Sequence, residues 1–575
     1  MTEMDTRKRW CLALVIAIAL AATATSIGNG FVLDDVVIVE KNAAVHSLTN
    51  WWQLFATSYW PLERGGGLYR PLPMLTWAVE WTVSGGAPWI FHAGNIVLYA
   101  ILAAAVLRLM WVIVPDWRAA LVGAALFAAH PVHVEAVGNV VALTELMSAL
   151  CVVLAMVAYI ERRRAGALSA RDVVLLAALY AGACLSKENG AMLPLLLLAA
   201  DVILVRDKTP WAERARRALP LVLALVGVAV GYLALRTNAL QMVKGEYPHV
   251  VWVVVPRLTR QLTMIGVAME WLRLLFWPLR LSAEYTPPYI RIVNDWTWAL
   301  VPALMMVYFA KGLMVVAFKR APVIAFASAW LVVTLFPVSN TVIVAGLILA
   351  ERTLLLPSVA AVLVGAWAAQ VAIDMRQAPR AVLWRRVGAA AAVLAVIAGT
   401  WRSAQRQLVW HDNERLFKQT VVDAPRAYRA HYNLGAWFME RGALADGERE
   451  LRSAIALFPH DYEPMAYLAN EYRKRDLCGP AVPLYQAAIL LAPRAADVRA
   501  GYTGCLIAGA QFDSARALAR RGVGKGWAGE LELKRLLGVA DSIEAALNAQ
   551  RASGRPCTPS RSPRESDSRS SCTSS

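Results

Sequence analysis

Runs of about 20 apolar residues, separated by short polar loops, fill the first 402 residues of the chain. Each run is long enough to cross roughly 30 Å of hydrocarbon as a helix. The runs lie near residues 10–28, 89–113, 119–136, 140–160, 172–186, 190–206, 218–236, 258–279, 296–318, 322–338, 353–373 and 387–402. The pattern predicts an all-α fold whose first part, residues 1–402, is a polytopic membrane helix bundle.

The loops between the runs predict how this bundle is oriented. Several short loops are rich in Lys and Arg, among them 162–164 and 319–320, and such loops stay on the cytoplasmic side. If all the runs crossed the membrane, the loop at 319–320 would lie outside. We therefore expect run 258–279 to be interfacial or re-entrant. The C-terminal part of the chain then lies outside, on the same face as the long loop at about 29–88.

After about residue 403 the pattern changes to that of soluble helices with a 34-residue repeat. Equivalent positions are Leu434, Leu468 and Tyr502, then Gly447, Ala481 and Ala515, then Ala454, Ala488 and Gly522. Small residues where two helices touch and large residues between pairs are typical of tetratricopeptide (TPR) repeats. We predict a short TPR α-solenoid over 403–530 and a terminal helix over 531–550. Its concave surface is expected to bind a protein partner, and a rigid cap on the membrane domain is the alternative. The Ser-, Arg- and Pro-rich segment 551–575 is predicted to be a disordered tail.

Composition narrows the possible functions. The 575-residue chain carries a net charge of +17, which in a soluble protein would indicate a nucleic-acid partner. Here the cations lie in loops between apolar runs and no nucleic-acid motif is present, so we expect no such partner. The chain has no convincing dinucleotide-binding or P-loop fingerprint and no CxxC or metal spacing. We expect no cofactor, and the spacing allows a Cys478–Cys505 disulfide without predicting it.

Two adjacent acids, Asp34 and Asp35, follow the first apolar run directly. In an extended segment neighbouring side chains point to opposite sides. One carboxylate could then accept a proton from a substrate hydroxyl as a general base, while the other holds the loop. The alternative is an acid pair that only caps a helix or stabilises the loop.

Further polar residues interrupt the apolar pattern and are candidates for substrate and phosphate binding. They are Tyr69, Arg70, His130, His133, Glu135, Glu145, Lys187, Glu188, Glu351 and Arg352. Arg and Lys can bind a phosphate, and an acid within an apolar run is a functional candidate. The two histidines with Glu135 could bind a metal, but their spacing is not the HExxH pattern. We favour a polar turn that shapes a substrate cavity, with no metal site.

Five motifs in a fixed order carry a resemblance to a known family. They are Phe31–Asp35, Tyr69–Leu72, His130–Val137, Ser186–Gly190 and Leu349–Ser358, followed by Trp410, Glu414, Leu416 and Phe417. In this order they resemble the transmembrane-and-TPR-containing O-mannosyltransferases, which are GT-C glycosyltransferases. The resemblance covers about residues 10–530. One departure is that Leu143-Thr144 stand where the family often has Gly-Arg.

The resemblance implies transfer of a sugar, mannose in the animal members, from a polyprenyl-phosphate carrier to a hydroxyl of a protein, with inversion. It also implies that Asp34 or Asp35 is the catalytic base. We add Arg70, Lys187 and Arg352 as candidates that contact the carrier phosphate. The acceptor is a protein or a glycan.

The Ala-, Val- and Arg-rich composition indicates a bacterial chain in the inner (cell) membrane, with the repeats outside. Two other functions fit the sequence. One is a transporter or flippase for a lipid-linked sugar, and the other is a non-catalytic envelope scaffold.

Overall fold

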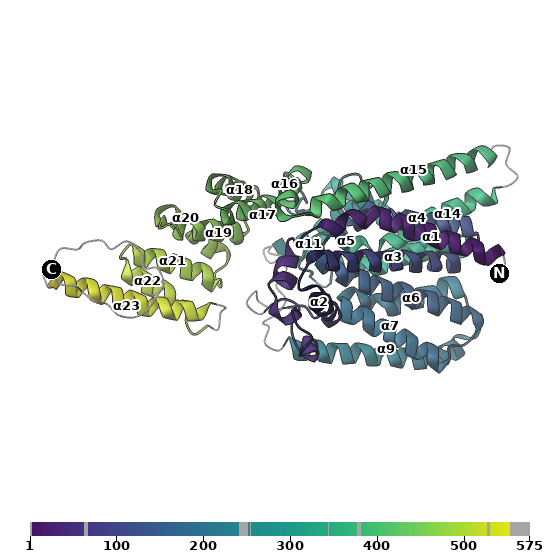
Figure 1. Ribbon diagram of the computed structural model, residues 1–575, viewed down its shortest axis with the longest axis horizontal. Coiled ribbons are helices and arrows are strands. Elements are labelled where there is room, and N and C mark those ends of the chain that lie inside the picture. Colours follow the sequence, from purple (N-terminus) through teal and green to yellow (C-terminus); the bar gives the residue numbers. More distant parts are fainter. Residues whose placement is uncertain are drawn as a thin grey trace. The chain divides into compact units, whose positions relative to one another are not determined.

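The computed structural model describes residues 3–61, 67–240, 251–252, 255–342, 344–375, 381–525 and 529–552 (Figure 1). These residues are mainly helical and form no strand, and one isolated bridge joins Pro288 to Ala427. The predicted all-α membrane bundle is confirmed. The tail predicted over 551–575 lies outside the described residues from 553 onward.

Six helical segments of the described residues are long and apolar enough to cross a membrane. They contain α1 (Glu3–Thr23) with η1 (Ala24–Gly28), α3 (Pro88–Ile113), α6 (Leu143–Ala165), α8 (Leu193–Ala200), α9 (Trp211–Ala239) and α15 (Ala381–Gln407). A seventh span is possible if a bent pair counts as one. In this pair, α4 (Trp117–Ala128) is followed after a 43° bend by the segment that ends with α5 (Val134–Gly138). The apolar run over 119–136 is therefore broken near Pro131, a residue that disrupts a helix.

The other predicted runs form helices that are not among these six segments. They are α7 (Ala170–Ser186), α11 (Arg257–Phe276), α12 (Val301–Arg320), α13 (Pro322–Leu335) and α14 (Ser358–Asp374). Helix α11 is the run predicted to be interfacial or re-entrant. It carries Arg257, Arg260 and Arg273.

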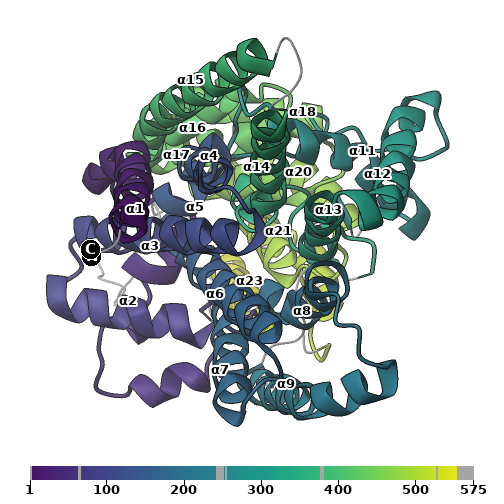
Figure 2. The ribbon, with the colours of Figure 1, turned by 90° about the vertical axis from the view of Figure 1, so that its right-hand side faces the viewer.

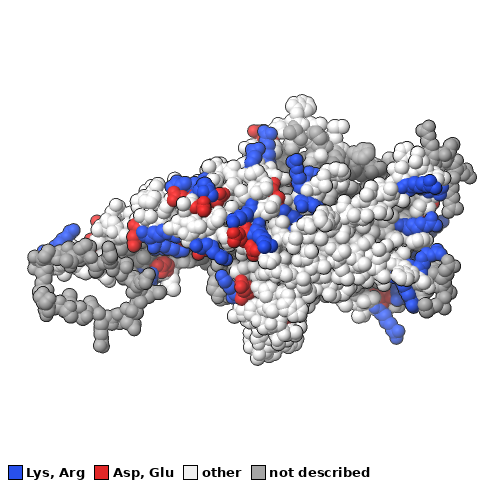
Figure 3. Space-filling model, turned by 45° about the horizontal axis from the view of Figure 1, so that its top comes forward, with Lys and Arg blue, Asp and Glu red and all other residues white. Residues whose placement is uncertain are grey.

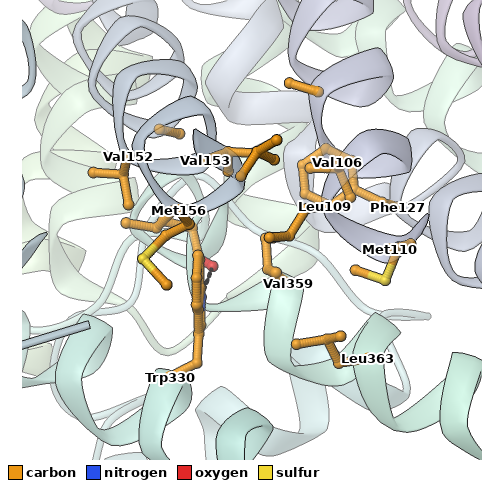
Figure 4. Close-up of a cluster of buried hydrophobic side chains, with 14 of the residues drawn as sticks. Val106, Leu109, Met110, Phe127, Val152, Val153, Met156, Trp330, Val359 and Leu363 are labelled. Carbon is orange, nitrogen blue, oxygen red and sulfur yellow. Dashed lines mark hydrogen bonds between the residues drawn. The ribbon is translucent and has the colours of Figure 1, made fainter. Parts of the chain in front are cut away.

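The centre of the bundle is packed by aliphatic and aromatic side chains from α3, α4, α6, α13 and α14 (Figures 2 and 4). The buried indole of Trp330 donates a hydrogen bond to the Leu356 carbonyl at 2.8 Å. Helices α4 and α14 approach closely at Gly123, where an added Cβ would lie 2.9 Å from that of Ala366. This packing fixes the helix ends, and therefore the loops that carry the candidate residues.

The first long loop folds into short helical turns that cover one end of the bundle. It contains η2 (Val36–Glu40), η3 (Ala43–Val45) and η4 (Trp51–Phe55), and leads into α2 (Pro71–Ser84). Its buried side chains pack on Phe91 of α3 and Val140 before α6. The loop that carries the acid pair is thus a packed layer against the membrane helices.

The C-terminal helices begin at the predicted spacing. Helices α17 (Tyr428–Glu440), α19 (Tyr462–Arg473) and α21 (Ala496–Ala508) start 34 residues apart, as do α18 (Leu444–Leu457), α20 (Cys478–Leu491) and α22 (Phe512–Arg520). They lie between α16 (Asn413–Asp423) and α23 (Glu530–Ala552). By internal contacts the chain divides into Met1–Phe458 and Pro459–Ser575, so α16–α18 belong to the first unit. The boundary predicted at residue 402 is a change in composition and lies before this division.

The second unit contains a disulfide bond. Cys478 at the start of α20 is joined to Cys505 in α21, with their Cα atoms 5.4 Å apart. The sequence had left this bond open.

Candidate active site

Asp35 is fully buried and binds backbone amides of two segments. Its carboxylate accepts hydrogen bonds from the N–H groups of Val141 at 2.8 Å, Val140 at 3.1 Å and Val32 at 3.3 Å. Val140 and Val141 begin the turn that leads into α6, so Asp35 fixes the first loop to this helix start. Burial raises the pKa of Asp35 to about 7, although these three hydrogen bonds lower it, and the charge of Asp34 adds to the rise.

Asp34 has different surroundings. It is half-buried, and no described residue donates a hydrogen bond to its carboxylate. The backbone turns sharply before it, because Leu33 has a φ of 50° and its N–H donates to Asn413 Oδ1 at 2.9 Å. The acid pair therefore lies in a helical turn, and the extended segment expected from the sequence is wrong. The two carboxylates nevertheless have different environments, and Asp34 is the one to which no residue in the described part of the chain donates a hydrogen bond.

Arg70, the residue before α2, binds Glu188 across the bundle end. Its Nη2 and Nε donate to the Glu188 carboxylate at 2.8 and 3.2 Å. The guanidinium also lies over the ring of Tyr59, 4.9 Å from the centroid. These contacts hold the guanidinium plane, and its Nη1 has no hydrogen-bond partner among the described residues.

Lys187 is buried where α7 ends, and its ammonium donates to the carboxylate of Glu145 in the first turn of α6. Its charge also interacts with those of Arg70 and Arg352. The two motifs that the sequence placed at separate helix ends are therefore neighbours in space.

Arg352 and Glu135 form a third ion pair. The Arg352 backbone N–H donates to Glu135 Oε2 at 2.9 Å, and its Nη1 binds Oε1 of the same carboxylate. Burial alone lowers the pKa of Arg352, but the carboxylates of Glu135, Asp34 and Glu145 raise it above its ordinary value. This cation thus interacts with Asp34, the carboxylate without a hydrogen-bond partner.

Three cations from different parts of the chain therefore share one charged cluster with Asp34. Each cation has one carboxylate partner, which offsets the cost of burying it. Each also keeps N–H donors that no described residue uses. Such donors, fixed before a ligand arrives, suit a phosphate oxygen.

The other predicted site residues have structural partners. Glu351 accepts hydrogen bonds from the Ser282 N–H at 2.6 Å and the Tyr285 hydroxyl at 2.5 Å. Burial raises the pKa of Glu351 to about 8, although Arg406 lowers it. The hydroxyl of Tyr69 donates to the Phe55 carbonyl at 2.8 Å, so Tyr69 stabilises the first loop.

The two histidines lie in the break between α4 and α5, where His133 is buried and His130 is half-buried. The Nε2 atom of His130 donates to the Leu275 carbonyl at 2.9 Å, and its Nδ1 accepts from the Val132 N–H at 3.3 Å. The ring nitrogens of His133 bind the Tyr99 hydroxyl and Ser358 Oγ, both at 2.8 Å. Both rings thus use both nitrogens, and the described residues contain no group of three His, Cys, Asp or Glu that could hold a metal.

Glu284 is a site residue that the sequence reasoning missed. Its charge interacts with those of Arg429, Glu135, Arg352 and Asp34, and burial, the largest influence, raises its pKa to about 7. It lies in the polar aromatic stretch at about 281–295. The signal that could have found it is this break in the apolar pattern beside α11.

The sequence comparisons identify relatives with one described activity. No family model matches the chain. It is 34% identical to "Protein O-mannosyl-transferase Tmtc2" of Drosophila melanogaster over 168 residues, 28% of this chain and 18% of that protein. It is 26% identical to TMTC3 of Mus musculus over 60% of this chain and 41% of that protein, and 26% identical to TMTC4 of Homo sapiens over 75% and 64%. The chain thus spans less than two thirds of each relative. The resemblance to these O-mannosyltransferases is confirmed.

Among solved structures, the chain is similar to the archaeal oligosaccharyltransferase AglB from Archaeoglobus fulgidus in complex with an inhibitory peptide and a dolichol-phosphate. The TM-score is 0.39 with 15% identity, over 80% of this chain and 60% of that one.

Proposed function

We propose that this chain is a membrane glycosyltransferase that moves a monosaccharide, mannose by analogy with its relatives, from a polyprenyl-phosphate carrier to a hydroxyl acceptor. The observation that carries the proposal is one cluster that contains Asp34 and the cations Arg70, Lys187 and Arg352. The Asp34 carboxylate accepts no hydrogen bond from the residues that the structure describes. The relatives are named as protein O-mannosyltransferases, which supports the proposed transfer of a sugar. A Ser or Thr of a protein is the acceptor that these names favour.

The mechanism follows from the two kinds of group in the cluster. Asp34 accepts the proton of the acceptor hydroxyl while its oxygen attacks the anomeric carbon. The bond from this carbon to the carrier phosphate breaks, the phosphate leaves with the electron pair, and the anomeric centre is inverted. The cations Arg70, Lys187 and Arg352 stabilise the charge that develops on the phosphate. Asp35 positions the base by holding its loop.

The cluster lies at the extracytoplasmic end of the bundle in this proposal. Support comes from the opposite end, where Arg162, Arg163 and Arg164 end α6, because basic loops stay in the cytoplasm. The Cys478–Cys505 disulfide also supports an oxidising compartment for the repeat unit, since disulfides are rare in the cytosol. In a bacterial cell the site and the repeats would face the periplasm, where the repeats would bind a protein partner.

Transfer by purified protein tests this proposal. Full-length protein is reconstituted with a polyprenyl-phosphate-linked mannose and Ser/Thr-containing peptides from envelope proteins, and products are identified by mass spectrometry. We expect a peptide heavier by one hexose, in the inverted configuration, and no product from Asp34→Asn. Movement of the lipid-linked sugar across sealed vesicles without transfer would instead identify a flippase. If the purified protein neither transfers nor moves the sugar, the scaffold function is the one that remains.

A further inference from the structure

A second charged site lies at the other end of the bundle. A cavity of about 860 Å³ opens between the start of α1, the ends of α3 and α6 and the beginning of α4. Its lining includes Arg7, Lys8, Arg108, Trp111, Trp117 and Arg164. These residues begin α1 or α4 or end α3 or α6, whereas the candidate active site follows α1 and precedes α6. The cavity and the active site are therefore separated by the length of the membrane helices.

The lining carries more positive than negative charge. It holds four cations and only two carboxylates, Asp116 and Glu161. Both carboxylates are already bound, because Asp116 accepts the Arg118 N–H at 2.8 Å as the cap of α4, and Glu161 pairs with Arg108 at 2.6 Å. Lys8 and Arg164 have no carboxylate partner among the described residues. The cavity thus keeps an excess of two positive charges, which attracts an anion.

The surroundings indicate which anion. The guanidinium of Arg7 lies 5.5 Å from the ring centroid of Trp117, and Trp111 lines the same cavity. Trp beside Arg and Lys at the end of apolar helices is typical of the membrane interface. Figure 3 shows Lys and Arg side chains gathered at the bundle end where the N-terminus lies, beside a broad uncharged surface. A soluble anion would need only the cations, whereas a lipid also uses the apolar helix surface below them.

We propose that this cavity binds the phosphate headgroup of an anionic glycerophospholipid from the leaflet opposite the active site. Arg7, Lys8 and Arg164 bind the phosphate, and the acyl chains lie along α1 and α3. A basic pocket between membrane helices on the cytoplasmic side is suited to such a headgroup. The volume is within the range of small-molecule sites. This site is independent of the transfer reaction and does not rest on it.

Lipid retention by the purified full-length protein tests the site. The protein is mixed with micelles of phosphatidylcholine containing phosphatidylglycerol, and bound lipid is counted by native mass spectrometry. A cation near the membrane surface contributes about five-fold in anionic-lipid affinity, so Arg7→Gln with Lys8→Gln should weaken phosphatidylglycerol retention by about 25-fold. The matched control is Lys319→Gln with Arg320→Gln, which removes the same two residue types from the last turn of α12, outside the cavity. Equal retention by the two double variants overturns the proposal.

A second variant leaves α1 unchanged, so that altered membrane insertion of α1 cannot explain a loss of bound lipid. Val112→Trp fills the cavity from its wall and leaves every charge in place. Reduced retention of phosphatidylglycerol by this variant, with an unchanged melting temperature, supports the site, and unchanged retention overturns it. Inorganic phosphate and glycerol phosphate are added as competitors. Displacement of the lipid by either at millimolar concentration would assign the cavity to a soluble anion and overturn the lipid assignment.

Discussion

The two acids of the first loop should respond to mutation in opposite ways. Asp35→Ala leaves the buried N–H groups of Val32 and Val140 without an acceptor, whereas the Val141 N–H keeps Asn139 Oδ1 at 3.1 Å. Each unsatisfied group costs about 1–3 kcal/mol, so the loss from the two groups is on the order of 2–6 kcal/mol. A domain is typically stable by only about 5–15 kcal/mol, and Asp35→Ala should therefore be strongly destabilised. Asp34→Asn breaks no hydrogen bond between described residues, and its stability should change by less than about 0.5 kcal/mol.

Sugar-transfer activity should distinguish the two residues in the opposite sense: the substitution at Asp34 that leaves stability unchanged should abolish most of the activity. Without a base, Asp34→Asn should lose about 10²–10⁴-fold in the rate of a single turnover while keeping the wild-type melting temperature. The assay pairs thermal melting in detergent with hexose transfer, measured on the same preparation. If Asp34→Asn transfers sugar at the wild-type rate, the base assignment is wrong. If Asp35→Ala is stable but inactive, Asp35 is the base and Asp34 is the residue that holds the loop.

Three further predictions concern the cation pairs, a buried acid and the disulfide. The double variant Lys187→Gln with Glu145→Gln removes a buried ion pair without leaving a lone charge. Its transfer rate should be about 10²-fold lower than that of the exposed control Arg162→Gln. If the two rates are equal, Lys187 does not belong to the site. Because the pKa of folded Glu351 is raised to about 8, the folded state holds a proton that the unfolded state releases from about pH 4.5 upward, so stability should fall until about pH 8. Glu351→Gln keeps both hydrogen bonds and should reduce this fall in melting temperature, whereas an identical pH profile would contradict the burial argument. Cys478→Ser removes a cross-link between residues 27 apart and should destabilise the second unit by about 3–4 kcal/mol. In intact cells a membrane-impermeant thiol reagent should label the freed Cys505 after this unit unfolds. If Cys505 is not labelled, the second unit lies inside the cell.

Much of the fold was predictable because it follows from periodicity. Apolar length gave the membrane helices, and the 34-residue repeat gave the helix starts at Tyr428, Tyr462 and Ala496. Periodicity does not predict where a helix is interrupted by a bend or a short turn. The bend before α5 and the short turns of the first loop depend on Pro131 and on tertiary hydrogen bonds such as those of Asp35, which join residues about 105 positions apart.

The candidate site was predictable as a set of residues but not as a set of partners. Arg70, Lys187 and Arg352 stood out because they interrupt apolar runs or lie beside them. Their pairing with Glu188, Glu145 and Glu135 depends on how helix ends meet in space. Glu284 was missed because its segment has no periodic pattern, and it enters the cluster only through the fold around α11 and α17.

The charge balance of the cluster explains why three cations are each held by a carboxylate. An unpaired buried cation would carry the full cost of its burial, whereas a cation paired with one carboxylate offsets that cost and can still donate its remaining N–H groups to the phosphate. In the proposed transfer the total charge is constant: Asp34 becomes neutral as it takes the proton, and the phosphate gains the negative charge that Asp34 loses. The cluster therefore has to favour moving one negative charge from Asp34 to the phosphate. Arg352 interacts with Asp34 before the reaction, and none of the described residues uses its Nε and Nη2 donors, so it can stabilise the charge at both positions. In this proposal Lys187, whose charge interacts with those of Arg70 and Arg352, biases the charge toward the leaving group together with Arg70.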